Sequence, residues 1–162
     1  MKIRGFKRKQ LYDEFISKFI PENINRYVEP FAGSFAVGTY ILYDKPPKLL
    51  IYNDINKYNI DILADAIHHL DYKEIFKMYD SEDTVFYLDP PYYQKEQAYV
   101  GCENYTKDFH IELHNEIKKL KGKVIMSYED RRFIMDLYKD FNIHTYKGDN
   151  RIFKYEIIIT NF

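Results

Sequence analysis

The chain alternates between short apolar runs and longer segments in which apolar and polar positions recur with helical spacing. Six runs are rich in β-branched and aromatic residues, which predicts strands. They are RYVEP at 26–30, KLLIYN at 48–53, TVFYL at 84–88, KVIMSY at 123–128, FNIHTY at 141–146 and KYEIIITN at 154–161. Because most of these runs are apolar at nearly every position, they are typical of strands buried on both faces of a parallel sheet.

Segments between these runs carry apolar residues at i, i+3, i+4 and i+7, which predicts amphipathic helices. One covers 55–70 and would end with His68 and His69 at the surface; another covers 108–120 and stops before Gly122. Strands separated by helices predict an α/β fold with a mostly parallel, doubly wound sheet. The connection 147–151 is too short for a helix, so we expect the last two strands to form an antiparallel C-terminal hairpin at one edge.

Size and composition predict a single domain over 1–162. The chain has 162 residues, 46% of them hydrophobic and 30% charged, with one Cys and a net charge of −1. Because the chain is nearly neutral overall, a polyanion such as a nucleic acid would have to bind to a local cluster of basic residues. No cluster of Cys and His has zinc spacing, no run approaches about 18 apolar residues, and no apolar segment follows the basic N-terminus. We therefore expect a cytoplasmic protein without a bound metal or a membrane span.

Three strand-to-helix junctions carry residues that a simple turn does not require. They are the segments 29–35, 53–56 and 89–92. In open parallel sheets, ligands bind at the carboxyl ends of the strands. We therefore expect the three junctions to converge on one site.

The first two junctions suit a ligand that contains a ribose. Gly33 has no Cβ, so backbone N–H groups can approach a ligand there, although a tight turn with positive φ explains the same glycine equally well. Asp54 comes about 20 residues later, where doubly wound folds often place an acidic group on ribose hydroxyls. The alternative role of Asp54 is the N-cap of the helix predicted over 55–70.

The third junction places hydrogen-bond acceptors beside an aromatic ring. Pro90 and Pro91 lack backbone N–H groups and fix φ, so they end the strand and leave carbonyl acceptors. Asp89 and a proline carbonyl could hold both N–H groups of an exocyclic amine and favour its pyramidal form as the nitrogen attacks. Tyr92 would stack on the base, which must be flipped or unpaired. The alternative is a strand terminator followed by a surface tyrosine.

Together the junctions resemble the motifs of the Dam-like, or D12-class, DNA adenine methyltransferases, in the family's order. YVEPFAGSFAV looks like the first cofactor motif, YNDIN like the ribose-binding motif and FYLDPPY like the catalytic motif. Weaker similarities in GFK, DFHIELHNEIKKL, KVIMSYED and YEIIITN extend the resemblance over most of the chain. It implies a Rossmann-like class I methyltransferase fold, S-adenosylmethionine as cofactor, DNA as partner and the adenine amino group as methyl acceptor.

The resemblance also implies which residues form the site. The residues that would be catalytic and hold the adenine are Asp89, Pro90, Pro91 and Tyr92. Those that would surround the cofactor are Lys7, Glu29, Phe31, Gly33, Asp54, Ile55 and Asp89. No chemistry is assigned to His110 or His114. Holding both reactants in line would make methyl transfer effectively intramolecular.

Two departures from the family's pattern bear on activity. The first motif normally has a second glycine where this chain has Phe35, so we expect the cofactor loop to be displaced or the pocket partly filled. Asp54 and Asp89 are 35 positions apart, whereas Dam-like enzymes insert a target-recognition domain in this interval. Base-specific readout needs side chains that reach the groove edges. We therefore expect relaxed or short-site specificity, or recognition by a separate partner subunit.

The loop between Tyr93 and Asp108 is the best remaining element for contacts with nucleic acid. Its basic, amide and aromatic side chains are Lys95, Tyr99, Asn104, Tyr105 and Lys107. DPPY is shared with some RNA guanine methyltransferases, which leaves an RNA base methyltransferase as one alternative. Phe35 and the short interval leave another, a non-catalytic relative that binds nucleic acid or a partner subunit.

Overall fold

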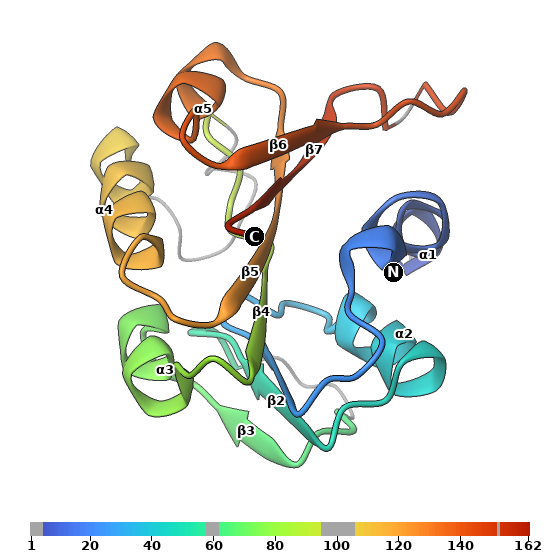
Figure 1. Ribbon diagram of the computed structural model, residues 1–162, viewed down its shortest axis with the longest axis vertical. Coiled ribbons are helices and arrows are strands. Elements are labelled where there is room, and N and C mark those ends of the chain that lie inside the picture. The colour runs from blue at the N-terminus through green and yellow to red at the C-terminus, as the bar shows by residue number, and fades with distance from the viewer. Residues whose placement is uncertain (1–4, 58–61, 95–105, 152) are drawn as a thin grey trace.

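The computed structural model describes residues 5–57, 62–94, 106–151 and 153–162, with side chains from Lys9 onward. Seven strands form one sheet in the order β3-β2-β1-β4-β5-β7-β6 (Figure 1). Their bounds are β1 (Arg26–Glu29), β2 (Leu49–Asn53), β3 (Ala66–His68), β4 (Thr84–Leu88), β5 (Lys123–Glu129), β6 (Asn142–Thr145) and β7 (Glu156–Thr160). The strands from β3 to β5 in this order are parallel, and β7 lies antiparallel to both β5 and β6. The predicted α/β fold and antiparallel C-terminal strand pair are confirmed.

Helices cover both faces of the sheet, as the continuous apolar strands require. They are α1 (Gly5–Glu14), the 3-10 helix η1 (Ile16–Phe19), α2 (Ala36–Asp44), α3 (Tyr72–Tyr79), α4 (Lys107–Ile117) and α5 (Arg132–Leu137). Figure 1 shows α1 and α2 on one face and α3, α4 and α5 on the other. The two faces bury separate cores, and neighbouring residues of β1 alternate between them, with Tyr27 in one core and Val28 in the other.

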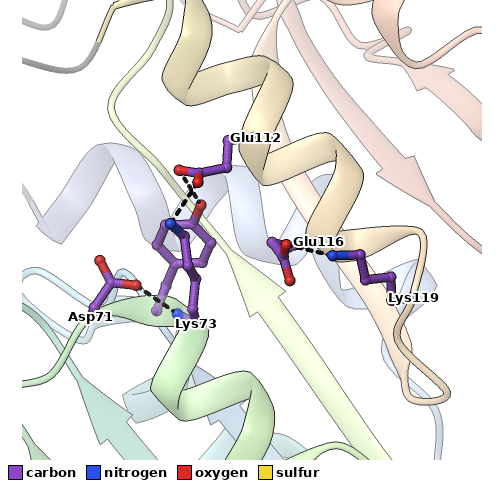
Figure 2. A network of polar contacts seen from close by, with 6 residues as sticks. Asp71, Lys73, Glu112, Glu116 and Lys119 are labelled. Atoms are coloured by element: carbon purple, nitrogen blue, oxygen red, sulfur yellow. Dashed lines mark hydrogen bonds and ion pairs between the residues drawn. The ribbon is translucent and has the colours of Figure 1, made fainter.

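Helix α3 begins where the Asp71 side chain accepts a hydrogen bond from the Lys73 backbone N–H at 2.9 Å. Its buried residues Ile75 and Phe76 face the sheet. On its outer side, Lys73 Nζ lies 2.6 Å from Glu112 Oε1 of α4 (Figure 2). These contacts join α3 to α4, the helix that follows the third junction.

The prediction of a helix over 55–70 is wrong. Its last part instead forms β3, which pairs in parallel with β2 through Ile51↔Ala66 and Asn53↔His68. The helical spacing of apolar residues was overridden by pairing with the sheet edge, because tertiary contacts outweigh local propensity.

The two histidines of this segment are therefore not surface groups at a helix end. His68 Nε2 lies 2.6 Å from the Tyr79 hydroxyl, and His69 Nδ1 lies 3.1 Å from the Asp54 carbonyl oxygen. Both side chains are half-buried. Among the helices that the structure describes, none is long and apolar enough to cross a membrane.

Candidate active site

Hydrogen bonds from backbone N–H groups join the first two junctions directly. The Ala32 N–H donates to the Asn53 carbonyl oxygen at 2.9 Å, and the Gly33 N–H donates to Asp54 Oδ2 at 2.8 Å. Strands β1 and β2, which precede these junctions, are neighbours in the sheet, and β4 lies on the other side of β1. The three junctions therefore follow the carboxyl ends of three adjacent parallel strands, as the sequence predicts.

The Asn53 side chain holds these loops together through buried hydrogen bonds. It is fully buried, and its amide nitrogen donates to the carbonyl oxygens of Pro30 at 2.9 Å and Leu70 at 3.0 Å. Its Oδ1 accepts from the Leu70 N–H at 2.9 Å. Asn53 thus connects the ends of β1, β2 and β3. Its role was not predicted from the sequence, although a buried amide at the end of an apolar strand needs hydrogen-bond partners.

Gly33 adopts a left-handed conformation with φ +53°. A Cβ built at this position would meet open space, with no atom within 4 Å. The positive φ therefore favours glycine at this position, which was the alternative explanation. The surroundings of Gly33 are also open enough for a ligand to approach.

Asp54 acts as a local turn cap as well as a link between loops. Its Oδ1 accepts from the Asn56 N–H at 2.9 Å while Oδ2 holds Gly33. Because residues 55–57 are not helical, the alternative role of Asp54 as a helix N-cap is wrong. Burial raises the pKa of the Asp54 carboxyl, and the two N–H donors partly oppose this shift. Each carboxylate oxygen can accept a second hydrogen bond. Ile55, the next residue, is 49% exposed.

Glu29, at the end of β1, carries a carboxylate that is only 2% exposed. The Tyr27 hydroxyl donates to Glu29 Oε1 at 2.8 Å from the same face of the strand. Burial, and after it the neighbouring Glu29 charge, raise the pKa of Tyr27 well above its usual value. The tyrosine therefore remains a hydrogen-bond donor to the glutamate at neutral pH.

Phe35 occupies a position that favours glycine. Its φ of 55° and ψ of 34° are left-handed, and its ring is 2% exposed in the core between the sheet and α2. The ring meets Tyr52 edge to face at 5.3 Å between centroids. The side chain thus points into the hydrophobic core, and the Gly33–Asp54 hydrogen bond is kept beside it.

At the third junction, Asp89 is half-buried and both prolines are buried. The Tyr92 hydroxyl donates to Glu156 Oε2 at 2.9 Å, and the Tyr92 ring lies 5.9 Å from that of Tyr128. The two prolines do follow the end of β4, as the alternative of a strand terminator requires, but Tyr92 is half-buried and held by these contacts and is not a simple surface side chain.

Aromatic rings line the α3 and α4 side of these junctions. Phe31 packs on Tyr72 at 5.3 Å and on Phe109 at 6.2 Å between ring centroids. His110, to which the sequence analysis gave no chemistry, is fully buried, with Nδ1 2.7 Å from the Tyr128 hydroxyl. Glu156 and His110 were both missed because their partners lie far away in the sequence.

Most of the predicted nucleic-acid contacts lie outside the described residues: Lys95, Tyr99, Asn104 and Tyr105. Lys107 is described and begins α4, where its Nζ lies 4.8 Å from the centroid of the Phe133 ring. The Lys7 backbone belongs to α1, but its side chain is not among those described.

Two solved structures of proteins assigned as methyltransferases share the fold. SMU.1697c from Streptococcus mutans, in complex with SAH, has a TM-score of 0.53 and 13% identity and matches over 99% of this chain and 97% of its own. HI0767 from Haemophilus influenzae has a TM-score of 0.55 and 15% identity, with 98% of each chain covered. At this identity the likeness shows the class I methyltransferase fold alone.

The sequence comparisons indicate the family. The Type II methyltransferase M.CviBI of Paramecium bursaria Chlorella virus NC1A is 35% identical over 94 residues, which cover 56% of this chain and 35% of that protein. The aligned part thus spans about a third of its relative. The profile of the D12 class N6 adenine-specific DNA methyltransferases matches residues 5–69 and 60–152, most of the chain. The chain therefore belongs to the D12 class of N6 adenine-specific DNA methyltransferases.

Proposed function

We propose that this protein transfers a methyl group from S-adenosylmethionine to the exocyclic amino group of adenine in DNA. Family membership supports methyl transfer in general. The observation that carries the specific proposal is the direct link between Gly33 and Asp54 at strand ends adjoining the Asp89–Tyr92 turn. This arrangement offers room and acceptors for a nucleoside cofactor next to acceptors for an amine.

The described residues fit the cofactor. Open space at Gly33 allows the ligand to approach the backbone, and the second acceptor positions of Asp54 suit ribose hydroxyls. The buried Glu29 carboxylate offers an acceptor for a cationic amino group at the end of β1. Phe31, Ile55, Asp89 and Lys7 complete the proposed set. When bound, S-adenosylmethionine supplies an electrophilic methyl carbon on a sulfonium.

In the proposed mechanism, the Asp89 carboxylate and the Pro90 carbonyl oxygen accept the two N–H groups of the target amine. These contacts favour the pyramidal nitrogen, whose lone pair is then directed at the methyl carbon. Tyr92 stacks on the base and holds it out of the duplex. Methylation would leave the nitrogen cationic, and Asp89, the carboxylate of the turn, would accept the proton that the amine then loses.

The source of sequence recognition follows from the short interval between Asp54 and Asp89. Its described residues form a turn, β3 and α3, and these elements belong to the sheet and its covering layer. We propose that the protein has relaxed or short-site specificity, or takes its specificity from a partner subunit. The segment 93–108, with Lys107 at its described end, is the proposed contact with nucleic acid.

The proposal is tested by incubating the protein with isotopically labelled S-adenosylmethionine and unmethylated single-stranded DNA, duplex DNA or structured RNA. Nucleoside mass spectrometry then identifies the methylated base. The matched variants are Asp89→Ala and Asp136→Ala, the second removing an exposed carboxylate of α5. We expect N6-methyladenine in DNA with the wild type and Asp136→Ala, and none with Asp89→Ala.

Other outcomes select other functions. Transfer to RNA alone would replace DNA as the substrate. If no substrate is methylated, calorimetric titration with S-adenosylmethionine decides the next step, because absent binding at millimolar cofactor would indicate a non-catalytic relative.

A further inference from the structure

A buried carboxylate contacts Tyr92, whose ring is proposed to stack on the target base. Glu156 is the first residue of β7 and is 8% exposed. It is 64 positions from Tyr92 in sequence, yet its Oε2 accepts the Tyr92 hydroxyl at 2.9 Å. The contact arises because β7 is antiparallel to β5, with Glu156 paired to Glu129, so β7 begins where the parallel strands end.

The Tyr92 ring is also supported on its flank. The Tyr128 ring lies 5.9 Å away at an interplanar angle of 35°. Tyr128 is fully buried and is itself held by the hydrogen bond between its hydroxyl and His110 Nδ1 at 2.7 Å. The Tyr92 ring is therefore anchored at its hydroxyl by β7 and along its side by β5.

We propose that Glu156 is a positioning residue that orients the Tyr92 ring for stacking on the target base. This inference rests on the proposed function. The ring torsion of a tyrosine is broad, so a loop tyrosine loses conformational entropy when a base stacks on it. A charge-assisted hydrogen bond to a carboxylate on a rigid strand removes this freedom before the base arrives. Glu156 acts through Tyr92 and does not touch the reacting atoms.

Three variants separate orientation of the ring from support of the fold. Tyr92→Phe keeps the ring and removes the donor, Glu156→Ala removes the acceptor, and Glu156→Gln keeps an acceptor of the same size. We expect Tyr92→Phe and Glu156→Ala each to raise the KM for DNA about tenfold, with Glu156→Gln within about threefold of the wild type. The dissociation constant of S-adenosylmethionine should stay within about twofold for all three.

The double variant Tyr92→Phe/Glu156→Ala gives the decisive comparison. If Glu156 acts through the hydroxyl, the double variant should be no worse than the poorer single variant. Thr160→Val is the control, because it removes a buried hydroxyl from the other end of β7, and its KM should equal that of the wild type. Losses that multiply, or a wild-type KM for Glu156→Ala, would overturn the inference while the proposed function stands.

Oligonucleotides with 2-aminopurine at the target position test the inference without methyl transfer. Stacking on Tyr92 quenches the fluorescence of the unpaired base, so at saturating protein the complexes with the wild type and Glu156→Gln should be dimmer than the complex with Glu156→Ala. Failure of the wild type to methylate any substrate would reject the proposed function, and the quenching series would then decide the inference by itself. Equal fluorescence of the three complexes would overturn it.

Discussion

The ring of Phe35 occupies the space that a side chain at position 38 would need. A Cβ built on Gly38, in the first turn of α2, would lie 2.2 Å from Phe35 Cε2. Phe35 itself adopts a left-handed backbone that costs a non-glycine residue about 1–2 kcal/mol. In this chain, the Phe35 ring is buried against Tyr52 and over Gly38, which has no side chain, and this burial offsets the strain.

Gly38→Ala should therefore be destabilising only while Phe35 is present. In the wild-type background we expect the free energy of unfolding to fall by about 1–3 kcal/mol, because the core is overpacked. In a Phe35→Ala background the same change should be neutral or stabilise by up to about 1 kcal/mol, since alanine is the better helix former. Urea denaturation of the wild type, the two single variants and the double variant measures these free energies of unfolding. A gain in stability in both backgrounds would show that the ring is free to move away.

The sheet and its three junctions could be predicted because buried parallel strands are continuous apolar runs, and prolines or acidic residues at their ends are conspicuous. β3 could not, because Ala66 and Ile67 continue a helical spacing and only the exposed edge of β2 makes them a strand. The hydrogen bond between Tyr92 and Glu156 could not be predicted either. It depends on β7 lying between β5 and β6, which a pattern of two consecutive strands does not reveal.

Asn53 should be among the polar residues that contribute most to stability. Asn53→Ala leaves the buried Pro30 carbonyl and two part-buried backbone groups of Leu70 without this partner, and we expect a loss of about 2–3 kcal/mol in the free energy of unfolding. Asn142→Ala is the matched control, because Asn142 also donates to a backbone carbonyl, that of Phe162, but is exposed. Asn142→Ala should lower the free energy of unfolding by no more than about 0.5 kcal/mol. Similar losses in both variants would argue against a special role for Asn53.

Stability should also depend on the protonation of His114. Its ring packs between Tyr138 at 5.0 Å and Phe141 at 5.7 Å, and its Nε2 is buried with no hydrogen-bond partner among the described residues. Burial lowers the pKa of His114 below 6.5, Lys118 lowers it further, and Asn115 and Asp140 oppose this. The folded protein thus holds a neutral imidazole, while the unfolded chain binds a proton at the usual pKa.

The sign of the effect follows from this difference. The contribution of His114 is fully present above pH 6.5 and is lost as the pH falls below that value. His114→Phe keeps an aromatic ring in the core and removes the titration, so its free energy of unfolding should fall less than that of the wild type between pH 7.5 and 5.5. Urea titrations at the two pH values measure both proteins, and equal falls would contradict the assignment.

Substitution of Asp54 and of Asp89 should impair different steps of the proposed reaction. Asp54→Ala removes the acceptor of the Gly33 N–H and the proposed ribose contact, so we expect the dissociation constant of S-adenosylmethionine to rise at least about tenfold. Asp89→Ala should leave that constant closer to the wild-type value and lower the methyl-transfer rate by about 100-fold or more, since its main proposed role is to hold the amine in the transition state. Calorimetric titration and single-turnover assays at saturating cofactor separate the two effects. Equal weakening of cofactor binding in both variants would contradict this division of roles, because it would mean that Asp89 serves the cofactor as much as the base.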